Sequence, residues 1–197
     1  MSPILKGVVA SGISGHLSTN SYESIATVTV GSGGTASVNF SSIPSTYKHL
    51  QIRCLTRGSN SASTCPIYLT VNGDTAANYS THQLLGNGAT AYADGHANAS
   101  YIIDGFGGFQ TLSGGDLAND FGVGIIDLLD YANTSKYKTA RALFGRDTNT
   151  TTGRIVFESG SWRNTNAITS LSFTTDTTTY GITWSQYTQF ALYGIKG

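Results

Sequence analysis

The sequence predicts an all-β fold, an antiparallel, jelly-roll-like β-sandwich of about ten short strands. Apolar and polar residues alternate over several short segments, which is the pattern of strands with one buried face. Clusters of Gly, Asn, Ser and Thr separate these segments, as expected of turns. No convincing helix of about ten residues and no repeat of fixed period is visible, which argues against a propeller or a solenoid.

The first strand pair is expected at 26–30 and 36–40. Ala26, Val28 and Val30 share one face, the glycines around residue 33 supply a turn, and Val38 and Phe40 continue the pattern on the return strand. Pairing about this turn places residue 30 opposite 36, 28 opposite 38 and 26 opposite 40. All three pairs are apolar, so the predicted register is self-consistent.

A second pair is expected at 50–54 and 65–69, with residue 54 opposite 65. This register makes Cys54 and Cys65, the two cysteines of the chain, face each other. Two interpretations stay open: a cross-strand disulfide, or two small, buried, reduced thiols. We favour the reduced thiols, because the chain is expected to be made in the cytoplasm.

The remaining elements follow in order along the chain. Residues 75–98 are expected to form a long polar excursion that carries binding loops. Further strands are expected at 100–103, 121–130, 139–145, 154–158, 168–174 and 189–195. Together they give one sandwich domain over residues 21–197.

The first 20 residues differ from this domain. They combine Gly and Ser with scattered apolar residues, and they show neither steady alternation nor a stable helical pattern. One interpretation is a docking arm for a partner, and the other is a segment that covers an edge of its own sandwich. The apolar residues of this predicted arm are Ile4, Leu5, Val8, Val9, Ile13 and Leu17.

The overall composition excludes several classes of partner. The chain of 197 residues has 11 Lys and Arg against 11 Asp and Glu, and only 11% of its residues are charged. Without a basic patch, nucleic acid and anionic membrane are poor partners, and no apolar run is long enough for a membrane span or a secretory signal. A surface with so little charge favours self-association, and we therefore expect an assembly.

The residues that carry chemistry do not form a recognisable active site. The nucleophile motif Gly-x-Ser-x-Gly does not occur, and the four histidines lack the short spacing of a zinc site. Asp127 and Asp130 are expected on opposite faces, which disfavours a pair of catalytic carboxylates. We therefore predict a protein that is not an enzyme, with no metal and no cofactor.

The aromatic residues near the C-terminus are the candidate surface-binding residues. Tyrosine and tryptophan rings can stack on sugars while neighbouring polar groups bind the hydroxyls. Packing in the core or between subunits is the competing interpretation, and we favour it for the tryptophans. The candidates are Trp162, Arg163, Tyr180, Trp184 and Tyr187.

Four stretches read together resemble virion structural proteins of tailed bacteriophages, particularly marine and cyanobacterial phages. They are SIATVTVGSGG at 24–34, FSSIPSTYKHLQIR at 40–53, DLLDYANTSKYKT at 127–139 and FALYGIKG at 190–197. The resemblance runs from about residue 25 to the C-terminus and carries over no catalytic residue. It implies a virion location, after synthesis in the host cytoplasm, and contacts with other virion proteins.

The resemblance leaves several placements open. We favour a tail fibre or adsorption appendage, a homotrimer by analogy, whose loops at 75–98 and 176–187 face the host and contact a surface glycan. A capsid decoration protein that stabilises the head is the main alternative. A polysaccharide-degrading tail module and a carbohydrate-binding module are the others.

Overall fold

The computed structural model describes residues 21–59, 65–102, 110–111, 119–147 and 153–197, and none of these is helical. The predicted docking arm, with Ile4, Leu5, Val8, Val9, Ile13 and Leu17, lies outside the described residues. The described chain contains thirteen strands. They are β1 (Tyr22–Thr29), β2 (Ser37–Phe40), β3 (His49–Thr56), β4 (Cys65–Pro66), β5 (Tyr68–Val71), β6 (Tyr79–Gly86), β7 (Ala91–Ala99), β8 (Gln110–Thr111), β9 (Gly122–Leu129), β10 (Lys138–Arg146), β11 (Arg154–Trp162), β12 (Leu171–Thr174) and β13 (Gln189–Ile195).

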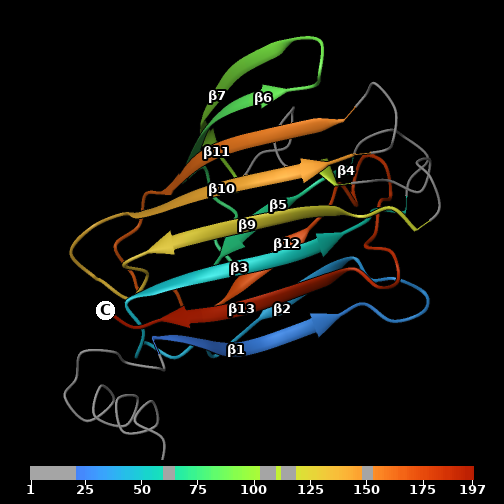
Figure 1. Cartoon of the computed structure of the whole chain (residues 1–197). Coiled ribbons are helices and arrows are strands. Elements are labelled where there is room, and N and C mark those ends of the chain that lie inside the picture. The colour runs from blue at the N-terminus through green and yellow to red at the C-terminus, as the bar shows by residue number, and fades with distance from the viewer. Residues whose placement is uncertain (1–20, 60–64, 103–109, 112–118, 148–152) are drawn as a thin grey trace, which may run out of the picture.

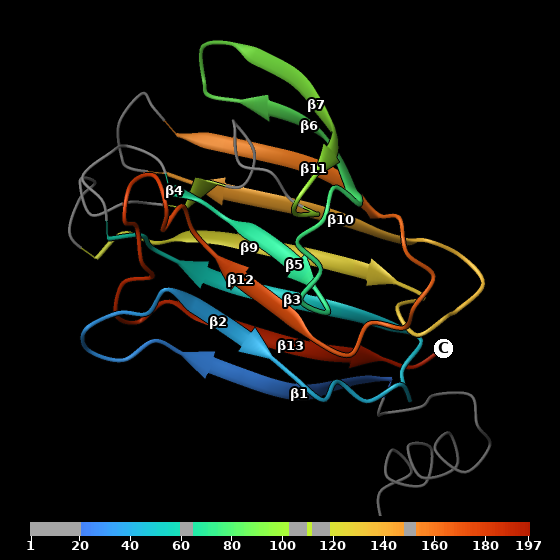
Figure 2. The same cartoon turned by 180° about the vertical axis from the view of Figure 1, so that it is seen from behind.

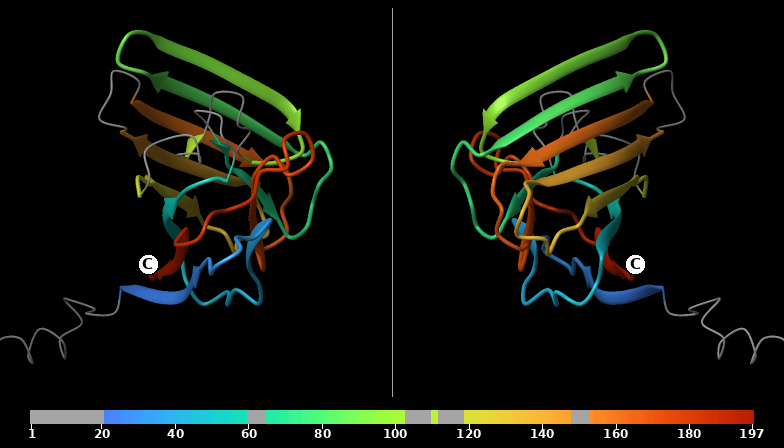
Figure 3. Two further views of the ribbon diagram at one scale, coloured as in Figure 1. Left: turned by 90° about the vertical axis from the view of Figure 1, so that its right-hand side faces the viewer. Right: turned by 90° about the vertical axis from the view of Figure 1, so that its left-hand side faces the viewer.

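The strands form two principal layers, and the predicted antiparallel sandwich is confirmed. The large sheet has eight strands in the order β1-β13-β3-β9-β10-β11-β6-β7, and the small sheet has the order β2-β12-β5. Figure 1 looks onto the outer face of the large sheet, and Figure 2 shows the small sheet lying across its other face. The side views show the β6–β7 hairpin extending beyond the small sheet (Figure 3). The jelly-roll connectivity stays a prediction.

The core fills the space between the two sheets. Alternate residues of β3 and β9 point inward and are buried, as the period of two requires. A chain of aromatic contacts crosses the layers, because Phe173 of the small sheet stacks on Phe190 of the large sheet with ring centroids 4.6 Å apart. Gly124 is required on β9, since a Cβ there would come within 2.2 Å of the Phe144 ring.

The hairpin expected at 26–40 is wrong. β1 pairs with β13 at the edge of the large sheet, with Val28 opposite Phe190. β2 pairs with β12 in the small sheet, with Val38 opposite Phe173. The glycine-rich loop therefore carries the chain from one sheet to the other, and the apolar residues of the two strands meet across the core.

The hairpin expected at 50–69 is also wrong, for the same reason. β3 lies between β13 and β9 in the large sheet, whereas β5 pairs with β12 in the small sheet. Cys54 is opposite Phe190 and Gly124, and Cys65 is opposite Thr111. The two cysteines are not strand partners. Both are free and buried, as the reduced-thiol interpretation has it.

The polar excursion expected at 75–98 is mostly a β-hairpin. β6 and β7 pair over their whole length at one edge of the large sheet, with Leu84 opposite Ala93. No described residue of the expected strand 100–103 belongs to a strand, because β7 ends at Ala99. The strands expected at 121–130, 139–145 and 189–195 are confirmed, and those at 154–158 and 168–174 are confirmed with shifted ends.

Candidate functional site

The outer face of the large sheet is the main candidate site. On β9, Val123, Ile125 and Leu129 point outward and are exposed, while the residues between them face the core or lie half-buried. The strand is therefore apolar on both faces. This pattern is typical of a strand that is covered on both sides.

Partner positions on neighbouring strands extend these apolar residues into a band. Ile125 is opposite Leu143 of β10, which is opposite Phe157 of β11, which is opposite Leu84 of β6. A second row runs beside the first. Val123 is opposite Leu55 of β3 on one side and Gly145 of β10 on the other, and Gly145 is in turn opposite Ile155 of β11. We call these seven residues the apolar stripe: Leu55, Leu84, Val123, Ile125, Leu143, Ile155 and Phe157. Each is between 41% and 64% exposed.

A hydrogen-bonded polar network lies beside the stripe on the same face. Gln51 is at its centre: its Nε2 donates to Asp127 Oδ1 over 2.9 Å, and its Oε1 accepts from Arg53 Nε over 3.1 Å and from the Tyr22 hydroxyl. Arg141 Nη2 donates to the other carboxylate oxygen of Asp127, over 2.9 Å. Four side chains on three central strands are thereby held in one arrangement, and Tyr22 of β1 joins them.

Two tyrosine rings complete this polar network near the β1 edge. Tyr22 and Tyr193 stack with ring centroids 4.9 Å apart. The Arg53 guanidinium lies over both rings, at 5.4 Å from the centroid of Tyr22 and 5.6 Å from that of Tyr193. A cation above an aromatic face is attracted to the ring electrons, so Arg53 is fixed from two sides. The polar network is therefore Tyr22, Gln51, Arg53, Asp127, Arg141 and Tyr193.

Sequence reasoning missed both the stripe and the network. The signal for the stripe was present in GVGIIDLL at 122–129, where large apolar residues occupy both faces of one strand. The network had no local signal, because its members come from five strands that are far apart in the sequence.

The two tryptophans among the candidate surface-binding residues are core residues. Trp162 is buried, and its Nε1 donates to Asp74 Oδ2 over 2.7 Å. This bond is the main cause that lowers the pKa of the Asp74 carboxyl. Trp184 is fully buried, and its Nε1 donates to the Phe173 carbonyl over 3.1 Å. Neither ring is available for stacking on a sugar, and the packing interpretation holds.

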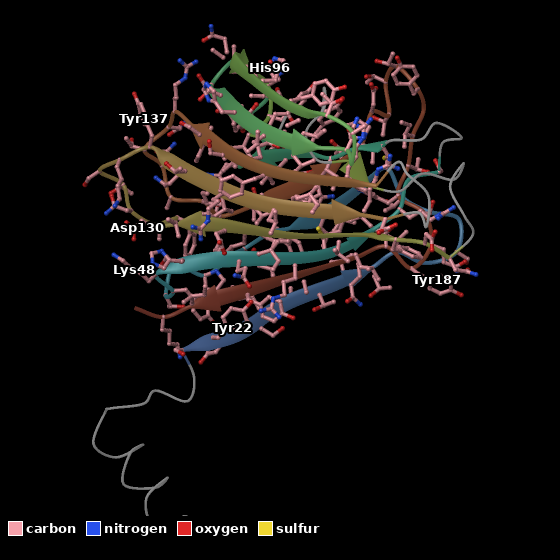
Figure 4. All side chains as sticks on the ribbon, turned by 45° about the horizontal axis from the view of Figure 1, so that its top comes forward. Tyr22, Lys48, His96, Asp130, Tyr137 and Tyr187 are labelled. Carbon is pink, nitrogen blue, oxygen red and sulfur yellow. The ribbon has the colours of Figure 1, made fainter. Side chains whose placement is uncertain are left out.

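The other three candidates are exposed but do not form one cluster. Arg163 follows directly after β11 and donates to the Ala77 carbonyl and to Asn98 Oδ1. Tyr180 and Tyr187 are 73% and 66% exposed and lie in the segment between β12 and β13. Tyr187 is at the opposite end of the sheet from Lys48, Asp130 and Tyr137 (Figure 4). Arg163 lies at the end that carries Lys48, Asp130 and Tyr137, because the residue before it, Trp162, is opposite Lys138, which follows Tyr137.

At the same end of the sheet, the buried ammonium group of Lys138 holds loops together. Lys138 is almost completely buried, and its Nζ donates to the carbonyl oxygens of Asn133, Lys136 and Thr165 over 2.6, 3.0 and 3.0 Å. Burial lowers the pKa of this lysine, with a smaller effect from the neighbouring charge of Lys136. Three carbonyl acceptors around one ammonium group suit a structural role.

The carboxylates that were candidates for acid–base chemistry are engaged by cations. Asp127 belongs to the polar network, and Asp130 binds Lys136 and, over 3.0 Å, Lys48. These two ammonium groups lower the pKa of Asp130 to about 2, with Lys136 the larger cause. Among the described residues, no three His, Cys, Asp or Glu side chains are grouped as a metal site would need. No described segment is a helix that could cross a membrane.

The two thiols do not form a reactive site. Burial raises the pKa of Cys54 and of Cys65 to about 12, so both are protonated at neutral pH. Cys54 Sγ contacts the Gly124 carbonyl at 3.7 Å, and Cys65 Sγ contacts the Pro66 carbonyl at 3.6 Å. Because the thiolate is the nucleophile, these cysteines act as small apolar residues.

Comparison with known proteins adds little to this description. The sequence matches no described protein family and no curated protein. Among solved structures, the fold is similar to Caenorhabditis elegans galectin LEC-6, at 10% sequence identity and a TM-score of 0.26, over 92% of this chain and 99% of the galectin chain. At so low a score the likeness carries no argument about fold or function.

Proposed function

We propose that this chain is a non-enzymatic structural subunit of a tailed-phage virion, a tail fibre or adsorption appendage that works as an assembled homo-oligomer. The apolar stripe on the outer face of the large sheet is the observation that carries the proposal. The resemblance at 24–34, 40–53, 127–139 and 190–197 supports the virion location. The homotrimer expected by analogy with phage appendages stays a prediction.

The stripe supports an assembled state on physical grounds. Apolar side chains in contact with water are unfavourable by about 25 cal/mol for each Å² that a partner would cover. Scattered exposed residues are normal, but a contiguous patch of this kind marks a contact with another molecule. The formal net charge of zero adds to this, because no long-range repulsion opposes association.

The end of the sandwich that carries Tyr180 and Tyr187 is the proposed host-facing end. Both rings are exposed, and Asp176 and Tyr187 help to shape the segment: Asp176 Oδ1 accepts from the Thr179 amide, and the Tyr187 amide donates to the Val30 carbonyl. Exposed tyrosines on a braced loop offer a flat apolar surface with a hydroxyl at its edge, which suits a surface glycan. The other segment expected to carry host-facing loops, 75–98, is mostly the β6–β7 hairpin.

Immunogold labelling of intact particles with an antibody to this chain tests the location. Label confined to the tail is the expected result. Label over the whole head would make the chain a capsid decoration protein, and particles without label would refute a virion role.

Host binding is tested with two variants of the assembled protein. Tyr180→Ala should weaken binding to host cells at least several-fold, because its ring is the most exposed of the aromatic side chains in the described chain. Tyr137→Ala is the matched control, since Tyr137 is also exposed but lies at the opposite end (Figure 4). Equal binding by both variants and the parent would exclude Tyr180 from host contact. Release of oligosaccharides from host polysaccharide would contradict the non-enzymatic role.

A further inference from the structure

We infer that the apolar stripe is the contact surface between two copies of this chain, packed with the outer faces of their large sheets against each other. The inference rests on the proposed function, because it names the partner that the stripe meets in the assembly. A contact in which both copies use the same face has two-fold symmetry, so the inference gives a dimer through the stripe in place of the homotrimer expected by analogy. Four observations carry it: the area of the stripe, its relief, its shape and the charges beside it.

The area fits a contact between subunits. Seven half-exposed side chains of this size, each with roughly 200 Å² when fully exposed, present on the order of 700 Å² of apolar surface. A stable protein–protein interface buries about 800 Å² on each partner. The largest apolar patch on an ordinary monomer is about 300–600 Å². The stripe is thus nearly a whole interface, before any polar residue at its border is included.

The relief of the stripe offers both projections and gaps. Gly145 separates Val123 from Ile155 on one row, and Gly86 follows Ile155 on the same row. A Cβ at Gly145 would touch only a Val123 methyl at 4.0 Å, and a Cβ at Gly86 would touch nothing within 4 Å. Leu143 and Phe157 project on the next row. A second copy can therefore seat its projecting side chains over the glycine gaps of the first.

The shape of the stripe favours another sheet as the occupant. It is two rows deep and extends over five neighbouring strands, β3, β9, β10, β11 and β6. Such a face is covered well by a second sheet, because two sheets pack about 10 Å apart with their side chains interdigitated. A single extended segment of chain covers one row at a time.

The charges beside the stripe suit a partner of the same composition. The polar network carries Arg53, Arg141 and Asp127, so both signs are present along the border of the stripe. Two copies brought together face to face therefore meet no single-signed field, and mixed charges at the border can set the register of the contact.

The test introduces a charge at the centre of the stripe in the full chain. Leu143→Glu should raise the dissociation constant of the oligomer at least about 100-fold, measured by sedimentation velocity over a dilution series. Thr139→Glu is the matched control, because Thr139 is exposed on the same strand and the same face, four residues away. The control should associate as the parent does. A monomeric parent, or an oligomer that Leu143→Glu leaves intact, would overturn the inference.

A second measurement identifies the occupant and does not depend on the stability of the variant. A photo-reactive amino acid at position 143 of the full chain should cross-link to residues of the stripe in another copy, which mixed isotope labelling separates from links within one chain. Cross-links to residues 1–20 would assign the face to the N-terminal segment and overturn the inference. The absence of cross-links between copies would also overturn it.

Failure of the inference and failure of the proposed function are distinguishable. If the chain is found on particles but Leu143→Glu does not change its association, only the face-to-face contact is wrong. If the chain associates through the stripe but is absent from particles, only the virion role is wrong.

Discussion

The side chain of Trp184 connects the two sheets, and its removal should be among the most damaging single changes. The ring is fully buried, meets Phe190 edge-on with centroids 5.3 Å apart, and donates to the Phe173 carbonyl. Its backbone exchanges hydrogen bonds with Thr35, at 2.8 and 3.1 Å. One residue thus contacts the large sheet, the small sheet and the loop that joins β1 to β2.

We expect Trp184→Ala to lower the free energy of unfolding by about 3–5 kcal/mol, the range for removal of a large aromatic side chain from a core. For a domain of this length, about 4 kcal/mol corresponds to a fall in Tm of about 8–16 °C. The loss combines the missing apolar contacts, the cavity that remains and the unpaired carbonyl of Phe173. Urea unfolding followed by far-UV circular dichroism, at one fixed protein concentration, measures it without depending on tryptophan fluorescence.

Two further variants separate these contributions. Trp184→Phe keeps most of the apolar volume but removes the indole donor, and it should lower the free energy of unfolding by about 1–2 kcal/mol. Tyr180→Ala is the exposed aromatic control and should stay within about 0.5 kcal/mol of the parent. A loss below about 1.5 kcal/mol for Trp184→Ala, or equal losses for Trp184→Ala and Tyr180→Ala, would refute the placement of Trp184 in the core.

Three other residues or pairs give independent tests. Lys138→Met should lower the free energy of unfolding by about 2–4 kcal/mol in the same urea assay, because three carbonyl oxygens lose their donor; a neutral effect would contradict the structural role of this lysine. The folded-state pKa of Asp130, about 2, is below its ordinary 3.8, so its stabilising contribution is complete above pH 3.8 and lost as the pH falls toward 2. In Asp130→Asn this part of the Tm–pH curve should flatten, and an unchanged curve would show that Asp130 is not the group responsible. Cys54 and Cys65 should not react with a thiol reagent at pH 8 in the folded chain and should both react in denaturant; fast reaction of the folded chain would contradict their burial.

The individual strands were largely predictable, but their partners were not. The alternation at 121–130, 139–145 and 189–195 marks β9, β10 and β13 nearly to the residue. The pairing of β1 with β13 joins residues at least 160 positions apart, and no local pattern distinguishes it from the hairpin expected at 26–40. The same limit applies to β3 and β5, which the expected register joined through Cys54 and Cys65.

The candidate site was predicted only where it depends on single residues. Exposure of Tyr180 and Tyr187 agrees with a surface role, and burial of Trp162 and Trp184 agrees with the favoured packing interpretation. The separation of these residues in the fold could not be predicted, because their positions depend on which strands are neighbours. The excursion at 75–98 was misjudged because Ala, Gly and Asn dominate β7, and these residues are poor indicators of a strand.

The sequence by itself determined the fold class, the low charge and the two-sided apolar character of 122–129, because each is a property of composition or of the local period of two. The tertiary structure alone decided the order of the strands, the separation of the two cysteines and the alignment of seven apolar residues into one stripe. The physical reason is that the hydrogen-bonding edge of a strand is much the same in every strand. Which edges meet is therefore decided by the packing of the whole core, and a surface built from five strands exists only once that packing is complete.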